Sequence, residues 1–167
     1  FAKAKIADLD RAFQSLPAST EQILHPKKYW SDKALDLPRT IVQDLSELPE
    51  GWEPVHSDVL GELFLGLMTL PKDSKLTAMS VGSLRYSDDS CDGWGGDRVQ
   101  VLAKGEARVL VLDSVWDTVQ DAAEFAAALA ARPAISDSGP HPAQARVEYE
   151  KGSSWVRLVA WYASSGD

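Results

Sequence analysis

The fold is decided by one stretch, Val99-Gln100-Val101-Leu102-Ala103-Lys104-Gly105-Glu106-Ala107-Arg108-Val109-Leu110-Val111-Leu112. Val99, Val101 and Ala103 alternate with Gln100 and Leu102, which is the period of a strand with two different faces. Lys104-Gly105 is a turn signal, and a nearly continuous apolar run follows over residues 109–112. The pattern predicts a β-hairpin over residues 99–112.

A second hairpin is predicted over residues 145–162, where Lys151-Gly152 supplies the turn before the apolar run that ends at Tyr162. Two amphipathic helices are predicted over residues 57–70 and 117–131. Ser57-Asp58 opens the first, and Asp117-Thr118-Val119-Gln120 caps the second, with Trp116 as a hydrophobic staple. The expected fold class is α+β, a mostly antiparallel sheet from two β-hairpins packed against amphipathic helices.

Residues 1–30 are predicted to form an N-terminal helical arm of the same single domain, which spans residues 1–167. Ile6, Leu9, Phe13 and Leu16 follow helical spacing, and Pro17 ends that helix. Ser19-Thr20-Glu21-Gln22 then has the pattern of a capping box. Because the first residue is Phe1 and no signal-peptide pattern follows, we expect the chain to be a fragment of a longer protein.

The charge balance argues against several classes of partner. The chain has 17 Lys and Arg residues against 25 Asp and Glu, a formal net charge of −8. Nucleic-acid binding relies on clustered cations, so no nucleic-acid partner is expected. No apolar run approaches the roughly 18 residues of a spanning helix, so we expect no membrane insertion by this chain.

Residues that would carry catalysis are few and scattered. The three histidines, His25, His56 and His141, fit no H-E-x-x-H zinc motif. Cys91 follows the acidic Ser87–Ser90 segment, where neighbouring carboxylates disfavour the reactive thiolate and a solvated loop is expected. We therefore predict no catalytic residue, no metal ligand and no cofactor in this chain.

The sharpest local motif is a glycine-rich turn that enters the first hairpin. It reads Gly93-Trp94-Gly95-Gly96-Asp97-Arg98 and lacks the Lys and Ser/Thr of a phosphate-binding loop. We predict a positive φ at Gly95 or Gly96, a buried Trp94, and an Asp97 that accepts backbone hydrogen bonds or pairs with an arginine. These six residues are the candidate groove residues; the alternative is a purely architectural turn.

Four motifs in this order resemble one bacterial family: residues 19–29 (STEQILHPKKY), Leu60-Gly61-Glu62, residues 93–98, and residues 116–125 (WDTVQDAAEF). The sequence resembles the C-terminal part of uncharacterised bacterial proteins that look like gluzincin-type zinc metallopeptidases. Many of these are secreted or lipid-anchored. In that family the zinc ligands lie upstream of the STEQ segment, so the resemblance assigns no catalytic residue here.

The resemblance implies a non-catalytic C-terminal domain that packs beside an upstream domain of the same protein and completes its substrate groove. The parent would be a metallopeptidase in the extracellular space or cell envelope; otherwise a cytoplasmic location is expected. One alternative is a free-standing binding or scaffold module without a protease domain. Another is a hydrolase that uses carboxylates such as Glu62 and Asp97.

Overall fold

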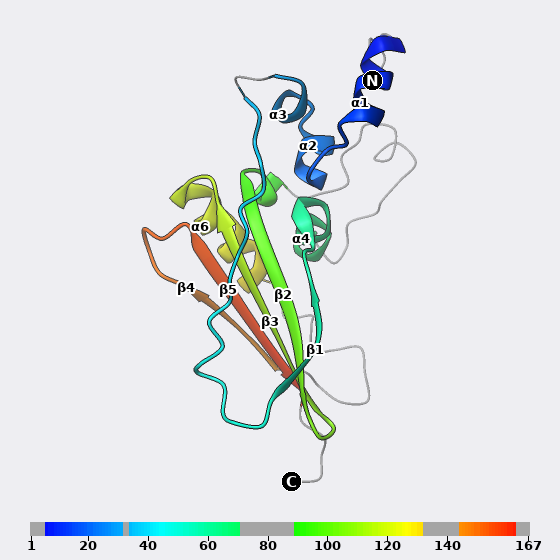
Figure 1. Ribbon diagram of the computed structural model, residues 1–167. Helices are drawn as coiled ribbons and strands as arrows, with labels where there is room; N and C mark the ends of the chain where they lie inside the picture. Colours follow the sequence, from blue (N-terminus) through cyan, green and yellow to red (C-terminus); the bar gives the residue numbers. More distant parts are fainter. Residues whose placement is uncertain (1–5, 32–33, 71–88, 132–143, 163–167) are drawn as a thin grey trace.

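The computed structural model describes residues 6–31, 34–70, 89–131 and 144–162. Its centre is a five-stranded antiparallel sheet with the strand order β1-β2-β3-β5-β4 (Figure 1). Helices accompany this sheet, which confirms the expected α+β class. The strands are β1 (Glu53–Asp58), β2 (Trp94–Lys104), β3 (Ala107–Trp116), β4 (Gln144–Tyr149) and β5 (Trp155–Tyr162).

The central hairpin is longer than the alternating pattern predicted. Strands β2 and β3 pair from Lys104 opposite Ala107 as far as Trp94 opposite Trp116. The register shifts between Trp94 and Gly96, so the glycine-rich motif is itself a bulged part of the strand. Strand pairing therefore continues well beyond the predicted boundary at residue 99.

The second hairpin joins the first through its C-terminal strand. Strand β5 pairs with β3 on one side and with β4 on the other. Arg108 lies opposite Tyr162 and Val115 opposite Trp155 in the β3–β5 pair. The two predicted hairpins thus share one sheet, with β4 as an edge strand.

Residues 57 and 58 lie in a strand and not in a helix, contrary to the helix predicted over residues 57–70. Strand β1 forms the other sheet edge through backbone pairing with β2, and its side chains are exposed. Such a strand has no apolar period to reveal it. Pro54 and the charged residues at its ends are typical of edge strands that avoid further pairing. The helix begins later, as α4 (Gly61–Thr69).

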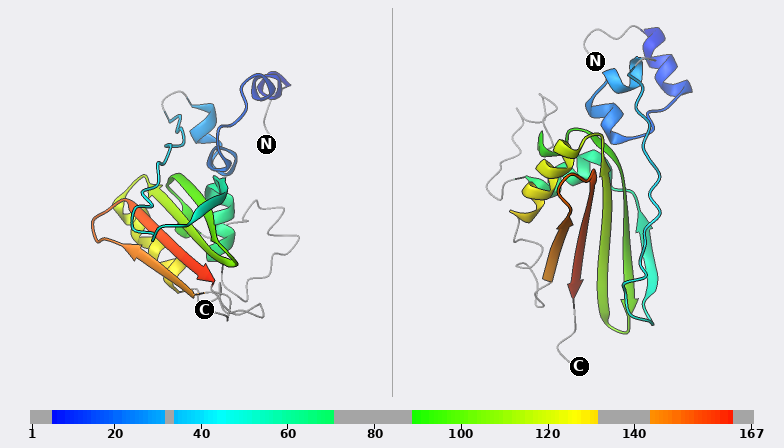
Figure 2. Two further views of the ribbon diagram at one scale, coloured as in Figure 1. Left: turned by 60° about the horizontal axis from the view of Figure 1, so that its bottom comes forward. Right: turned by 90° about the vertical axis from the view of Figure 1, so that its left-hand side faces the viewer.

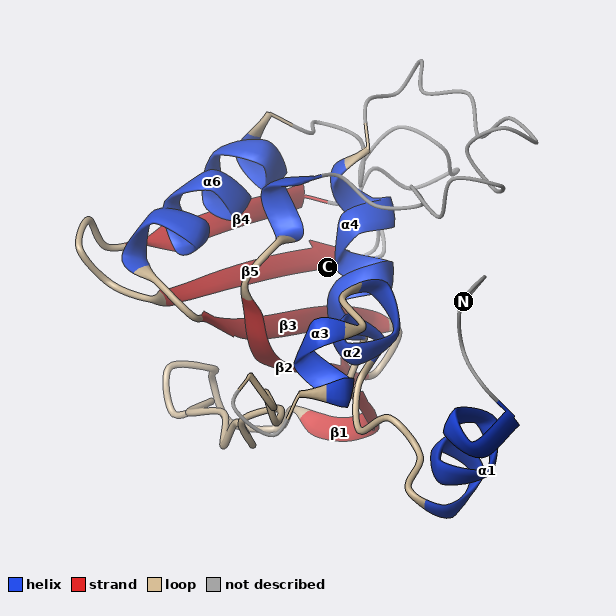
Figure 3. Ribbon diagram, turned by 90° about the horizontal axis from the view of Figure 1, so that it is seen from above, coloured by secondary structure: helices blue, strands red, loops and turns tan. Residues whose placement is uncertain are grey.

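The sheet is covered on both faces. Helices α4 and α6 (Val119–Ala130) lie on one face, and the connection formed by residues 34–52 runs along the other (Figures 2 and 3). The core under the helices is built around Leu65, Trp116 and Phe125. The core on the opposite face contains Leu102, Val109, Val111 and Val159, with Leu45, Leu48 and Trp52 packed against it.

The cap of α6 is shifted by one residue from the predicted pattern. Thr118 is the N-cap; its hydroxyl accepts from the Asp121 N–H, and the Asp121 carboxylate accepts from the Thr118 N–H. The helix therefore runs over Val119–Ala130 rather than 117–131. Trp116 packs against Phe125 with ring centroids 4.5 Å apart, and both side chains are buried.

The N-terminal arm contains α1 (Ile6–Gln14), α2 (Thr20–Leu24) and α3 (Lys27–Trp30). Helix α1 lies far from the sheet (Figure 1), and Phe13 and Leu16 are exposed. Ser19 caps α2 by accepting from the Gln22 N–H, as predicted. The Gln22 side chain, however, accepts from the N–H of Ala18 instead of Ser19.

No helix in the described ranges is long and apolar enough to cross a bilayer. Residues 76–86 and residues 134–143, which include His141, lie outside the described residues.

Candidate functional site

The glycines of the 93–98 motif allow two other segments to approach the turn. Gly93 has φ +78°, and a Cβ there would lie 2.4 Å from Oδ2 of Asp121 in the α6 cap. Gly96 has φ +155°, and a Cβ there would lie 2.3 Å from the carbonyl oxygen of Arg39. The Arg39 N–H donates to the Gly95 carbonyl at 2.7 Å. Larger side chains would separate the turn from α6 and from residue 39.

Trp94 and Asp97 fix this turn to the start of α4. Trp94 is 1% exposed, and its indole N–H donates to Oδ1 of Asp97 at 3.0 Å. Asp97 also accepts from the backbone N–H of Leu60 at 2.8 Å and of Gly61 at 2.7 Å. Burial raises the pKa of Asp97, while these three hydrogen bonds oppose the rise. Three predictions are therefore confirmed: the positive φ at Gly96, the buried indole of Trp94, and the backbone hydrogen bonds that Asp97 accepts.

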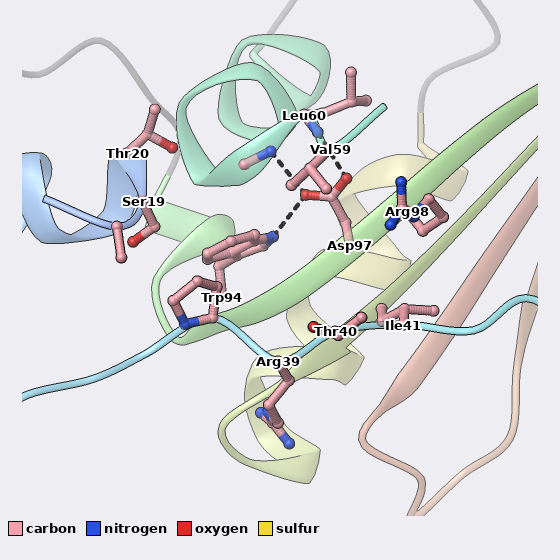
Figure 4. A pocket seen from close by; sticks show the side chains of 13 residues that line it. Ser19, Thr20, Arg39, Thr40, Ile41, Val59, Leu60, Trp94, Asp97 and Arg98 are labelled. Carbon is pink, nitrogen blue, oxygen red and sulfur yellow. Dashed lines mark hydrogen bonds between the residues drawn. The ribbon is translucent and has the colours of Figure 1, made fainter. Parts of the chain in front are cut away.

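A pocket of about 410 Å³ opens beside this turn (Figure 4). Of the candidate groove residues, Trp94, Asp97 and Arg98 line it, whereas the three glycines do not. Its wall is mainly apolar, with hydroxyl groups and the Arg98 side chain among the polar lining. Such a lining suits a short apolar side chain flanked by polar groups. The other lining residues are Ala18, Ser19, Thr20, Pro38, Arg39, Thr40, Ile41, Val59, Leu60 and Gly61.

Lys28 forms a charge cluster that joins the arm to the sheet domain. Its ammonium group donates to carboxylates of Glu21 at 2.6 Å, Asp36 at 2.8 Å and Asp117 at 2.9 Å. Burial raises the pKa of Glu21 to about 7, although Lys28 opposes the rise. The bonds to three carboxylates raise the pKa of Lys28 in spite of its desolvation. Burial is the larger influence, so Glu21 keeps its proton to a higher pH than an exposed glutamate does.

We expect the free energy of unfolding to fall as pH rises from about 4.5 to about 7. In that window Glu21 holds a proton in the folded chain and has lost it in the unfolded chain, whose pKa is near 4.5. Glu21→Gln removes this dependence. Between pH 4.5 and pH 8, the free energy of unfolding of the variant should therefore rise relative to that of the wild type by about 3 kcal/mol, at about 1.4 kcal/mol per pKa unit. Urea unfolding at the two pH values measures the difference.

The matched control is Glu106→Gln in the exposed turn of the central hairpin, which removes one carboxylate without touching Lys28. Its free energy of unfolding should follow the wild-type pH dependence. Equal pH slopes for Glu21→Gln and Glu106→Gln would contradict the assignment.

A second cluster, which no sequence pattern predicts, contains His25, Glu62 and Asp92. Nε2 of His25 lies 2.8 Å from Oε1 of Glu62 and 3.6 Å from Oδ1 of Asp92. Glu62 is fully buried, and burial raises its pKa against the influence of His25. Asp92 is largely exposed, and its pKa is also raised, chiefly by desolvation.

Two side chains have environments that differ from those predicted. Cys91 is fully buried at the end of a 3-10 helix, Asp89–Cys91, because it packs into the core with Leu65 and Phe125. This part of the acidic segment is therefore not a solvated loop. Trp155, which begins the apolar run of the second predicted hairpin, is nevertheless 48% exposed. It lies at a groove of about 750 Å³ between residues 42–47 and strands β4 and β5.

A family model described as a domain of unknown function, DUF8575, matches residues 47–160, more than half of the chain. The chain belongs to this family. No curated protein and no solved structure matches the chain.

The DUF8575 match begins after the helical arm and includes β1 and α4 through to β5. Trp94, Asp97, Glu62 and Asp92 fall inside it. His25 comes before it, as do the pocket residues of the arm and of the 38–41 segment. The pocket and the His25 cluster are therefore both formed where the DUF8575 domain meets the preceding residues.

Proposed function

We propose that this chain is a non-catalytic binding domain that receives a segment of the upstream domain of the same protein in the pocket beside Trp94 and Asp97. The observation that carries the proposal is the pocket itself, which three of the six candidate groove residues line. In this proposal the parent is a secreted or envelope-anchored bacterial metallopeptidase-like protein, as the resemblance of the motifs implies.

The hydrogen bonding of Asp97 favours a binding role over a hydrolytic one. Its carboxylate already accepts from Leu60, Gly61 and the Trp94 indole. These bonds hold α4 and the turn together, so Asp97 acts as a fixed acceptor under the pocket rather than as an acid or base. A general acid or base needs to reach the proton that it transfers.

The rim of the pocket gives a direct test. Val59 is 47% exposed and Thr40 is also exposed, so a tryptophan at either position can fill the pocket without entering the core. We expect Val59→Trp and Thr40→Trp each to weaken binding at least tenfold. The probe is the preceding domain of the parent protein, expressed alone and titrated by calorimetry.

Val55→Trp on strand β1 is the matched control, because Val55 is exposed and lies outside the pocket. This variant should bind as the wild type does. An absence of binding by the wild type, or wild-type affinity in both pocket variants, would exclude the proposal. A parent protein with no protease domain upstream would instead favour the alternative, a free-standing binding or scaffold module.

A further inference from the structure

Three separate elements bring His25, Glu62 and Asp92 together. His25 is the C-cap of α2, Glu62 lies in the first turn of α4, and Asp92 follows the 3-10 helix that ends at Cys91. One ligand atom from each residue lies within 4.8 Å of the other two. One imidazole nitrogen and two carboxylates form a donor set that divalent zinc accepts.

The carboxylate of Glu62 supplies an independent indication that the cluster can bind a cation. The side chain is 1% exposed, and one of its oxygens already faces His25. Its other oxygen, Oε2, is buried and has no hydrogen-bond partner within the described part of the chain. A buried carboxylate oxygen without a partner is costly, and a metal ion that Glu62 binds through both of its oxygens would remove that cost.

The two separations from His25 are also close to those between ligands of a small tetrahedral ion. Zinc bonds to nitrogen and oxygen are about 2.0–2.1 Å long, which places tetrahedral ligands about 3.3 Å apart. The separations of 2.8 Å and 3.6 Å from His25 Nε2 lie on either side of that value. Because the Asp92 side chain is 60% exposed, the fourth position can face solvent.

The acidic cluster around Lys28 differs from the His25 cluster because it already contains a positive charge. Glu21, Asp36 and Asp117 also have carboxylate oxygens within 4.8 Å of one another. The Lys28 ammonium bonds to all three, so that cluster already contains its cation. In the His25 cluster no lysine or arginine bonds to the two carboxylates within the described residues, and the imidazole of His25 is the partner that they share.

We propose that His25, Glu62 and Asp92 form a divalent metal site for zinc, with three protein ligands and a solvent-facing fourth position. The site revises the sequence-based expectation of no metal ligand. Its ligands are far apart in the sequence, and none belongs to a zinc motif. It is distinct from the pocket at Trp94 and does not depend on that pocket's role.

Titration of the untagged chain with zinc chloride tests the site. We expect one bound zinc ion per chain, and at least tenfold weaker binding in Asp92→Asn and in Glu62→Gln. Asp92→Asn is the safer variant, because the exposed side chain can change without disturbing the core. Cobalt substitution gives a second readout, since a tetrahedral cobalt ion absorbs visible light more strongly than an octahedral one.

His56→Ala is the matched control. His56 is exposed and lies 3.9 Å from an Asp58 oxygen, so it presents a histidine and a carboxylate without a buried third ligand. This variant should bind zinc with wild-type affinity. The proposal is overturned if the wild type binds no stoichiometric zinc, or if Asp92→Asn and Glu62→Gln both retain wild-type affinity. A simple ion pair of His25 with Glu62 would then account for the cluster.

Discussion

Replacing Trp116 with alanine is expected to lower the free energy of unfolding by about 3–5 kcal/mol, the usual cost of truncating a buried aromatic side chain. Trp116 is fully buried, contacts Phe125 at a ring-centroid distance of 4.5 Å, and donates its indole N–H to the Ser114 hydroxyl at 3.1 Å. It also lies opposite Trp94 in the β2–β3 pair. Truncation therefore opens a cavity where the sheet, α6 and the glycine-rich turn meet.

Trp155→Ala provides a control with the same change in side chain. Trp155 lies on the neighbouring strand β5 but is 48% exposed, so its truncation should cost under about 1.5 kcal/mol, well below a fully buried site. Urea denaturation of both variants at one pH measures the two losses. Similar losses, or a loss below about 1 kcal/mol for Trp116→Ala, would show that the core does not rely on Trp116.

Local patterns in the sequence were sufficient to predict both hairpins and the helix that follows Trp116. Alternation and the Lys-Gly turns act over a few residues, so they predict the pairing of β2 with β3 and of β4 with β5. The place of β5 between β3 and β4 depends on long-range pairing, which leaves no local signal. Strand β1 was missed for a related reason: its pairing is through the backbone, and its exposed side chains carry no apolar period.

The candidate site was predicted in part. The glycine-rich motif indicated the buried Trp94 and the acceptor role of Asp97, because a turn with adjacent glycines has a short-range physical cause. What the glycines accommodate could not be predicted, since Arg39 and Asp121 reach them from distant parts of the chain. The Lys28 and His25 clusters were missed in the same way: their members are adjacent only after α2, α4 and the α6 cap have assembled.

Asp97→Ala is expected to destabilise the chain at least as much as Trp116→Ala. Its removal leaves three donors without their acceptor: the N–H groups of Leu60 and Gly61 and the indole N–H of Trp94. Each buried donor left unpaired costs about 1–3 kcal/mol. Three such losses are comparable to the whole stability of an ordinary domain. We therefore expect a large drop in the urea midpoint or a chain that does not fold, with Asp10→Ala, at an exposed position of α1, as the neutral control.

Asp97→Asn is a milder substitution that tests the same hydrogen bonds if the alanine variant does not fold. Asparagine has the same shape, but its amide oxygen can replace only one of the two carboxylate oxygens, and its NH₂ group must face a donor. If the amide oxygen takes the place of Oδ1, Gly61 and Trp94 keep their bonds and the Leu60 N–H loses its acceptor. The expected loss is about 1–3 kcal/mol, with the Trp94 indole N–H still protected from hydrogen exchange. Wild-type stability in this variant would mean that the charge of Asp97 and its bond to the start of α4 do not hold the turn in place.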